Sequence, residues 1–471
     1  MNLWMEGIRS WYNEQDYLAA MESWDDWIRE EYDWHDQEHV DDNDNNNDND
    51  NPLFQLSGSN NHAVELLVFM AGCHLDSTNA SMAQTYIHRA IHACTTIEEA
   101  IPAIQEYISM TATLSNHQKA RNVIQWAMTA GSSTTTTTTQ EQQEPEYPSS
   151  SYWNDPYQRP GYIHPQIKAM PWYERQDHPT WCSTILEQHY SIILQEYLKL
   201  PIHYFHNVGS GMHRSSGDND ASIVTTTTGT TGTTTTTTAA AGGGEWNEVV
   251  LFGTGATPHV APQTCALLQT HLPDAVQLAE CGGGEIIFSV LRPKTKLQSH
   301  CGTTNLRLTA HLGLVVPPEE NNNKNENEFG TCKIRVKDTW HTWKEGECIV
   351  FDDSFEHEVI NDTTSSRAVL LVRFWHPDVK DRTKAMAAAL QAKEDDILRR
   401  YNPPLPPNYE KRTSVQQRGL ERTSCPRCFQ TGYRNIRVMD NTIITNRSFT
   451  HDNNDVNCNV AFHCSCGEPI D

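Results

Sequence analysis

Four cysteines near the end of the chain have the types and spacing of metal ligands. Cys425 and Cys428 form the C-x-x-C of CPRC, and Cys464 and Cys466 form a C-x-C pair after a gap of 35 residues. Two thiolate pairs on tight turns can complete a tetrahedral zinc site. A short polar tail needs such a link in order to fold.

The tail, residues 421–471, is therefore expected to be a small zinc-ribbon-like unit with RNIRVMDNTIITN and NVAFHC as strands. Cys458 and His463 are rival ligands for the second pair, and free thiols are the alternative to structural zinc. The chain has 13 cysteines and no visible export signal, which favours reduced thiols and a metal site over a disulfide scaffold.

A second group of polar side chains lies on one face of an expected strand. In LRLTAHLGL (306–314), Arg307, Thr309 and His311 alternate with apolar residues. Because successive side chains of a strand point to opposite faces, these three share one face and the apolar residues share the other. Such a strand lines either a polar cavity or the solvent.

The stretch SRAVLLVRF (366–374) has the same alternation, with Arg367 and Arg373 on one face. His357 follows the turn FDDSFE and begins another expected strand. Taken alone, each of these residues is more often found on the surface. Together they form a pattern that needs a common explanation.

That explanation is a family resemblance. The runs SHCGTTNLRLTAHLGLVVP, TWKEGECIVFDDSFEHEVINDTTSSR and FWHP strongly resemble the aspartyl/asparaginyl β-hydroxylases, which are Fe(II)- and 2-oxoglutarate-dependent dioxygenases. PWYERQDHPTW, EWNEVVLFGTG and APQTCALL extend the resemblance weakly upstream, so that it covers 172–378. It implies a double-stranded β-helix, the jelly roll of the cupins, which the short strands after residue 245 indicate independently.

The resemblance implies that His300 and His357 hold Fe(II), since neutral imidazole suits this ion and two ligands leave an open face for co-substrate and oxygen. In the wider superfamily a carboxylate stands two residues after the first histidine. Here that residue is Gly302, and the β-hydroxylase family also has glycine there, with water in the vacancy. Asp352 and Asp353 are assigned turn and supporting roles rather than ligand or acid-base roles.

Four further residues are implied to bind 2-oxoglutarate. Arg367 and Ser289 match the family's partners for the distal carboxylate, which an arginine fork binds in a geometry that lysine cannot copy. His311 matches the histidine near the metal-proximal carboxylate. Thr309 stands where well-known family members have arginine, so one positive donor is missing. Arg307, on the same strand face, either compensates for it or supports the barrel wall.

The implied function is hydroxylation of the β-carbon of aspartyl or asparaginyl residues in a protein or peptide. Fe(II) is the implied cofactor, 2-oxoglutarate and O2 are consumed, and succinate and CO2 are released. Hydroxylation of a lipid or small molecule is the alternative within the same enzyme class. A catalytically inert barrel in a helical-repeat and zinc adaptor is the alternative from another class.

The elements around this domain follow from periodicity and composition. Apolar residues recur at helical spacing over 1–130, which predicts either a plain helical domain or a tetratricopeptide-like array, with the acidic Asn/Asp insertion 41–51. Residues 131–171 are expected to be a disordered linker, and 210–244 a disordered insertion in the dioxygenase domain. A helix and a Pro-rich linker are predicted over 379–420. The whole is thus multidomain.

Charge and hydropathy limit the partners. The 471 residues contain 35 Lys and Arg against 60 Asp and Glu, a net charge of −25, which disfavours a nucleic-acid coat protein. No apolar run reaches the ~20 residues that a membrane span needs, and no amino-terminal leader is visible, which favours a cytoplasmic protein. The sequence says nothing of the oligomeric state.

Overall fold

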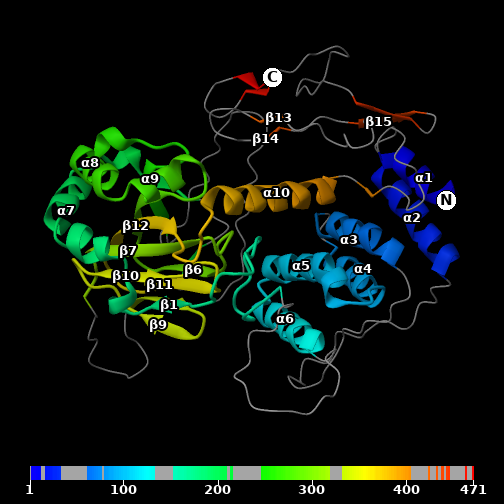
Figure 1. Cartoon of the computed structure of the whole chain (residues 1–471), viewed down its shortest axis with the longest axis horizontal. Coiled ribbons are helices and arrows are strands. Elements are labelled where there is room, and N and C mark those ends of the chain that lie inside the picture. Colours follow the sequence, from blue (N-terminus) through cyan, green and yellow to red (C-terminus); the bar gives the residue numbers. More distant parts are fainter. Residues whose placement is uncertain are drawn as a thin grey trace. The chain divides into compact units, whose positions relative to one another are not determined.

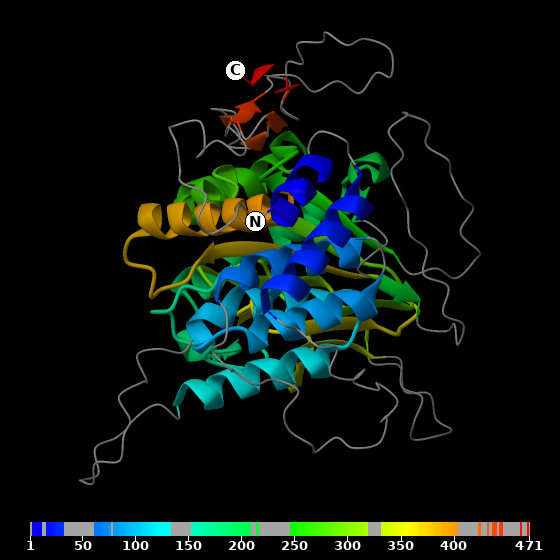
Figure 2. The same cartoon turned by 90° about the vertical axis from the view of Figure 1, so that its right-hand side faces the viewer.

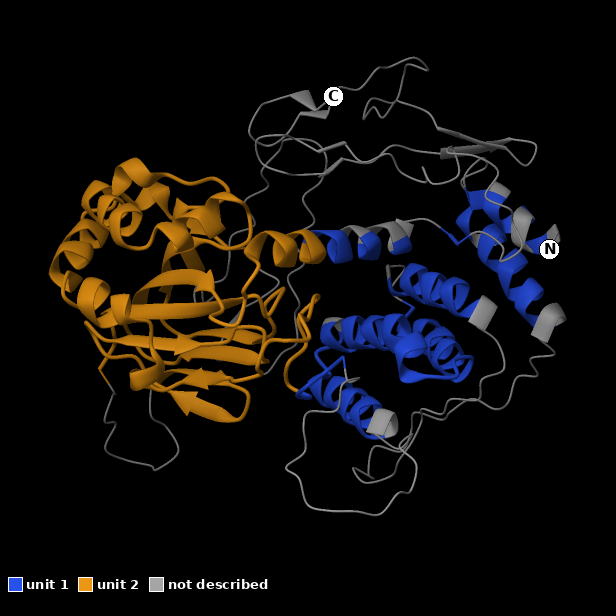
Figure 3. Cartoon of the chain, in the orientation of Figure 1, with its two compact units in different colours: residues 1–156, 390–471 blue, residues 157–389 orange. Residues whose placement is uncertain are grey.

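The computed structural model describes residues 2–11, 16–32, 61–76, 79–132, 152–208, 213–215, 245–318, 331–401 and 403–404, and short strand segments after residue 422. Figure 3 shows the two compact units into which the chain divides. One unit comprises Met1–Pro156 with Leu390–Asp471, and the other comprises Tyr157–Ala389.

The amino-terminal part of the first unit is helical, as the apolar spacing predicts. Its helices are α1 (Asn2–Arg9), α2 (Tyr17–Tyr32), α3 (Asn61–Asp76), α4 (Ala80–His92), α5 (Ile97–Thr113) and α6 (His117–Ser132). Figures 1 and 2 show α3 to α6 as neighbours that lie side by side. The buried stripe of α4 contains Ala83, Tyr86, Ile87, Ala90 and Ile91, the spacing of one helix face. The choice between a plain helical domain and a tetratricopeptide-like array stays open.

The second unit contains two antiparallel sheets. One has the strand order β1-β10-β7-β12-β5-β4-β2 and the other β3-β6-β11-β8-β9. The strands are β1 (Trp172–Tyr173), β2 (His206–Asn207), β3 (His213–Ser215), β4 (Trp246–Phe252), β5 (Ile286–Leu291), β6 (Thr295–His300), β7 (Arg307–Val315), β8 (Cys332–Val336), β9 (Thr339–His341), β10 (Cys348–Phe351), β11 (His357–Asn361) and β12 (Arg367–Trp375). From β5 to β12 the chain passes back and forth between the two sheets, which is the cupin-like arrangement of a jelly roll (Figure 1).

The two faces of the larger sheet have different partners. Its outer face packs against helices α7 (Tyr190–Leu198), α8 (Pro262–His271) and α9 (Pro273–Glu280), with Leu308, Ala310 and Leu312 of β7 in the shared core. On its inner face, Val369 and Leu371 of β12 share a core with residues of β8 and β11. The alternation predicted for β7 and β12 is therefore confirmed, and their polar residues face the barrel interior rather than the solvent.

Two segments differ from the expected linkers. Residues 152–171 belong to the folded structure, and Gln158 and Arg159 in this stretch are buried. The prediction of a disordered linker over 131–171 is wrong for this part, because its order comes from contacts with distant residues that composition does not reveal. Within the expected insertion 210–244, His213–Ser215 pairs with β6 as strand β3, since an edge strand offers unpaired backbone groups.

The helix predicted after residue 379 is α10 (Arg382–Tyr401). The tail contains the short strand pairs β13 (Thr423–Ser424) with β14 (Thr431–Gly432), β15 (Ile436–Met439) with β16 (Thr442–Thr445), and β17 (Phe462–His463) with β18 (Pro469–Ile470). Cys425, Cys428, Cys464 and Cys466 lie outside the described residues, so the zinc ribbon stays a prediction. None of the helices described is long and apolar enough to cross a membrane.

Candidate active site

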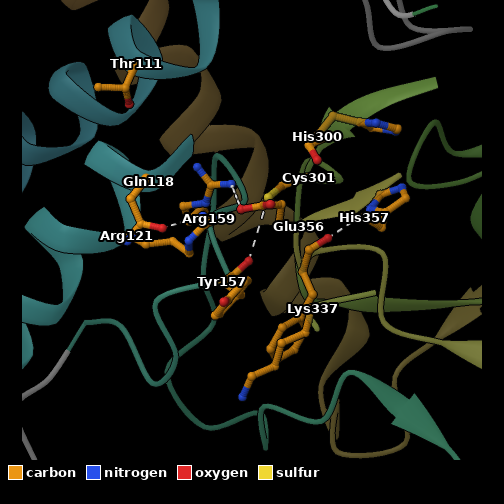
Figure 4. Close-up of polar contacts among 12 residues, drawn as sticks. Thr111, Gln118, Arg121, Tyr157, Arg159, His300, Cys301, Lys337, Glu356 and His357 are labelled. Atoms are coloured by element: carbon orange, nitrogen blue, oxygen red, sulfur yellow. Dashed lines mark hydrogen bonds and ion pairs between the residues drawn. The ribbon is translucent and has the colours of Figure 1, made fainter. Parts of the chain in front are cut away.

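Two histidines face each other across the pairing of β6 with β11. His300 is the last residue of β6, His357 is the first of β11, and the two are direct partners in the antiparallel register. Their ring centroids lie 4.1 Å apart (Figure 4). The sheet therefore brings together two imidazoles that are 57 residues apart in the sequence.

The backbone fixes which nitrogen of each ring is free. Nδ1 of His300 lies 2.7 Å from the carbonyl oxygen of Gln298, and Nδ1 of His357 lies 2.8 Å from that of Phe355. A carbonyl oxygen accepts, so Nδ1 of each ring carries the proton and donates it. In the neutral rings Nε2 then keeps its lone pair, which is the form that binds a metal ion.

The surroundings also keep both rings neutral. Burial lowers the pKa of His300. Burial and the neighbouring His300 together lower the pKa of His357 to about 3. A ring that resists protonation at neutral pH leaves its lone pair available to a cation.

A segment that precedes the barrel holds the strand of His357 in place. Gln158 forms a β-bridge with Phe355, and the amide of Glu356 donates to the carbonyl oxygen of Tyr157 over 2.7 Å. The Glu356 carboxylate binds Arg159 at 2.6 Å, a pair that Figure 4 shows on the side of the strand away from the His357 ring. Residues 157–159 thus fix the position of β11.

Arg335 of the neighbouring strand β8 also binds Glu356, and it pairs with Glu358 as well. Its Nη2 lies 3.1 Å from Glu356 Oε1, and its Nε lies 2.7 Å from Glu358 Oε1. Glu356 and Arg159 are both buried, and buried charges are tolerated only when they are paired and hydrogen-bonded in this way.

Gly302 has no space for a side chain. A Cβ placed on it would lie 2.7 Å from Oδ1 of Asp353 and 3.0 Å from the carbonyl oxygen of the same residue. The carboxylate of Asp353 thus stands where a side chain at position 302 would begin. A negative group is present beside the two histidines, but it comes from the turn before β11 rather than from the strand end after His300.

The two adjacent aspartates have opposite electrostatic environments. Burial would raise the pKa of Asp353, but the guanidinium groups of Arg373 and Arg307 hold it below its ordinary value. Burial raises the pKa of Asp352 to about 8. Asp352 accepts hydrogen bonds from the Ser354 amide and from Gln158, in agreement with the turn role expected for it.

Arg367 and Ser289 lie together on adjacent strands, as the sequence predicts. Nη1 of Arg367 donates to the carbonyl oxygen of Ser289 over 3.4 Å, and Ser289 Oγ accepts from the indole nitrogen of Trp246 over 3.0 Å. The guanidinium carbon of Arg367 lies 4.5 Å from the ring centroid of Trp343. Arg367 is buried and has no ion-pair partner among the described residues, so its charge is available to an anion.

His311 and Thr309 lie on the same inner face. Nδ1 of His311 accepts from the indole N–H of Trp343 over 3.2 Å, so Nε2 carries the proton of the neutral ring. Burial, followed by the charge of Arg367, lowers the pKa of His311 well below its ordinary value. Arg307 donates to the Gly283 carbonyl oxygen and to Thr303 Oγ1, and it therefore supports the barrel wall.

Three contributors to the site are not predicted by the sequence. Trp343 contacts both Arg367 and His311, and nothing in the local sequence marks it. The alternation along β12 predicts the strand face of Arg373 but indicates no role for it. Residues 157–159 fall in the predicted linker, and the structure shows that they hold the strand of His357.

Several buried polar atoms in this interior indicate that a polar ligand belongs there. Within the described ranges, Thr309 Oγ1, His311 Nε2, Asp353 Oδ1 and Arg367 Nε are buried without a hydrogen-bond partner. No group of three or more His, Cys, Asp or Glu side chains in the described part of the chain could hold a metal ion. His300 and His357 could serve as two protein ligands for a metal, and they lie beside donors that fit a carboxylate.

The sheets and the paired imidazoles define a cupin-like domain with a two-histidine site. Residues 187–377 match the family described as "Aspartyl/Asparaginyl beta-hydroxylase", so this domain is similar to the aspartyl/asparaginyl β-hydroxylases. The family resemblance predicted from the sequence is confirmed.

Individual relatives agree with this assignment. The chain is 36% identical over 150 residues to the aspartyl/asparaginyl beta-hydroxylase of Mus musculus, a match of 31% of this chain and 18% of that protein. It is 35% identical over 99 residues to aspartate beta-hydroxylase domain-containing protein 2 of Xenopus tropicalis, covering 20% of this chain and 24% of that one. The chain therefore spans less than a quarter of the length of these relatives.

Among solved structures, a prolyl-4-hydroxylase of Pseudomonas putida is similar to this chain with 17% identity and a TM-score of 0.19. That match covers 28% of this chain and 72% of the other.

Replacing Gly302 tests the space that Asp353 occupies. We expect Gly302→Ala to lower the free energy of unfolding by about 1 to 3 kcal/mol, because the new Cβ forces the carboxylate to move. Gly302→Asp should be at least as destabilising. Urea unfolding measures both, with Gly161→Ala as the control, because a Cβ at Gly161 lies at an ordinary 3.6 Å from Thr303. Equal stability of Gly302→Ala and the control would contradict the steric argument.

The low pKa of His357 makes stability depend on pH. In the unfolded chain this ring takes up a proton near pH 6.5, whereas in the folded protein it does so near pH 3. Its contribution to stability is therefore present above about pH 6.5 and is lost as the pH falls toward about 3. Urea unfolding of the metal-free protein between about pH 7 and pH 4 should show this loss. His357→Gln should make the dependence less steep without abolishing it, because burial also lowers the pKa values of His300 and His311. His271→Gln, a change at an exposed histidine, serves as the control.

Proposed function

We propose that this domain is an Fe(II)- and 2-oxoglutarate-dependent dioxygenase that hydroxylates aspartyl or asparaginyl residues of a protein or peptide at the β-carbon. The observation that carries the proposal is the pair of neutral imidazoles, each with its Nδ1 bound to the backbone and its Nε2 free. The family assignment of residues 187–377 supports it.

The donor set fits both cofactors. Nε2 of His300 and Nε2 of His357 would hold Fe(II), for which imidazole is a suitable ligand. With 2-oxoglutarate and O2, the bound iron supplies an oxidation that places one oxygen atom in a C–H bond of the substrate and the other in succinate, with release of CO2. Gly302 has no side chain that could act as a third ligand.

The chain's own residues bind and orient the co-substrate. Arg367 offers a buried guanidinium whose Nε has no partner within the described residues, which suits the distal carboxylate of 2-oxoglutarate. His311 offers Nε2–H as a donor to a second carboxylate, because Trp343 fixes the tautomer. The buried aromatic rings around these donors exclude water, which strengthens each polar contact.

The substrate class comes from the relatives, whose names specify aspartyl and asparaginyl residues or aspartate. We propose a protein or peptide substrate for this chain on that basis. There are two alternatives. The first is a dioxygenase that acts on a lipid or small molecule, and the second is a catalytically inert barrel in an adaptor protein. Structural zinc in the cysteine-rich tail is proposed separately, and metal analysis of the full chain tests it.

Turnover of carboxyl-labelled 2-oxoglutarate tests the activity. We expect wild-type protein with Fe(II) and ascorbate to release labelled CO2 and succinate, and His300→Ala and His357→Ala to fall to the metal-free background. His271→Gln, a change at an exposed histidine, should retain full turnover. The dioxygenase proposal fails if wild-type protein neither turns over nor binds 2-oxoglutarate.

The substrate is identified in the same assay by adding a peptide library and following, by mass spectrometry, the gain of one oxygen atom. Oxidation at Asp or Asn side chains supports the proposed substrate class. Turnover that is stimulated only by lipids or small molecules would instead indicate a lipid or small-molecule substrate.

Removal of the guanidinium at Arg367 tests its role separately. A charge-assisted hydrogen bond contributes about 1.5 to 3 kcal/mol, so Arg367→Met should raise the KM for 2-oxoglutarate by about 10- to 100-fold. Arg382→Met, which removes an exposed arginine paired with Asp274, serves as the control. An unchanged KM in Arg367→Met would exclude Arg367 as the carboxylate partner.

A further inference from the structure

The interior of the barrel has unpaired polar atoms at the end away from Arg367. Thr309 Oγ1 and His311 Nε2 are buried on the inner face of β7, and neither has a hydrogen-bond partner within the described residues. A hydroxyl and an imidazole N–H side by side on one strand face can both donate to a carboxylate. Neither group carries a positive charge when the imidazole is neutral.

A guanidinium reaches this place from the neighbouring strand. Arg373 is the direct partner of Thr309 in the pairing of β12 with β7, as Leu371 is of His311. Residues paired directly across two strands project to the same face, so Arg373 and Thr309 are neighbours inside the barrel. Arg367 lies six residues earlier on the same face of the same strand, at its other end.

The contacts of Arg373 leave one of its nitrogens free. Its Nε donates to Asp353 Oδ2 over 3.1 Å, and its Nη1 donates to Glu285 Oε1. Nη2 makes no hydrogen bond to the described residues, so it is available to a ligand. The two carboxylates hold the planar group in one orientation beside the histidine pair.

Arg307, the other arginine near this place, is already engaged. Its Nη1 donates to the Gly283 carbonyl oxygen over 2.6 Å and its Nη2 to Thr303 Oγ1 over 3.3 Å. Moving it to a ligand would leave the Gly283 carbonyl oxygen without this bond. Arg373 is therefore the better placed of the two cations.

We propose that Arg373 binds the metal-proximal carboxylate of 2-oxoglutarate, with Thr309 and His311 as further donors. Arg367 and Arg373 then bind the two carboxylates of one dicarboxylate from the two ends of β12. The positive donor that is missing at position 309 is supplied by the residue paired with it across the sheet. This inference rests on the proposed function.

Two probes separate this role from a purely structural one. 2-Oxoglutarate has both carboxylates, whereas 4-oxopentanoate keeps the ketone and the distal carboxylate and lacks the proximal one. Binding of each to the full chain with Mn(II) is measured by ligand-observed NMR, which detects weak binding and needs no turnover. The ratio of the two dissociation constants reports the contact with the proximal carboxylate.

In Arg373→Met we expect the affinity for 2-oxoglutarate to fall by about 10- to 100-fold and that for 4-oxopentanoate to change by less than about 3-fold. Arg367→Met should weaken both probes, and the exposed Arg382→Met should weaken neither. If Arg373→Met binds 2-oxoglutarate as wild type does, or loses both probes by the same factor, the proposal is wrong.

A second comparison covers the case in which Arg373→Met does not fold because Asp353 is left without its cation. Asp353→Asn/Arg373→Gln removes both charges together and is compared with Asp353→Asn alone. The preference for 2-oxoglutarate over 4-oxopentanoate should be lower in the double variant than in Asp353→Asn. An equal preference in the two variants would overturn the proposal. Failure of wild-type protein to bind 2-oxoglutarate would refute the proposed function itself, which distinguishes the two failures.

Discussion

The register between β6 and β11 is the constraint on which the site depends. It sets His300 directly opposite His357, and a slip of one residue would turn one imidazole to the other face of the sheet. Residues 157–159 secure this register from outside, because they pair with Phe355 and bind Glu356. The free Nε2 atoms and the placement of Asp353 against Gly302 follow from that alignment.

The barrel interior keeps a positive charge, although the chain as a whole is acidic. Asp353 is held ionised by Arg373 and Arg307, whereas burial raises the pKa of the adjacent Asp352 to about 8, so that it is mostly protonated at neutral pH. Arg367 has no ion-pair partner among the described residues. The interior therefore keeps a positive charge that a bound anion can neutralise.

The residue pattern within single strands predicted much of this arrangement. Contacts between distant parts of the chain could not be predicted in this way. Alternation along β7 and β12 was sufficient to predict their inner faces, and the run FDDSFEHEV was specific enough to indicate the family. The role of Arg373 depends on which residue lies opposite Thr309, and that register is set by the whole sheet. Residues 157–159 are ordered through contacts with residues almost 200 positions away, which composition cannot reveal.

Trp343 joins the two ends of the proposed co-substrate site. Its ring lies against Arg367, and its N–H fixes the tautomer of His311, so one rigid side chain spaces the two groups. An aromatic ring cannot lengthen or shorten as a flexible side chain can. Under the proposed binding, the indole fixes the distance between the two carboxylate-binding groups. The barrel then selects among dicarboxylates by the number of carbons between their charged ends.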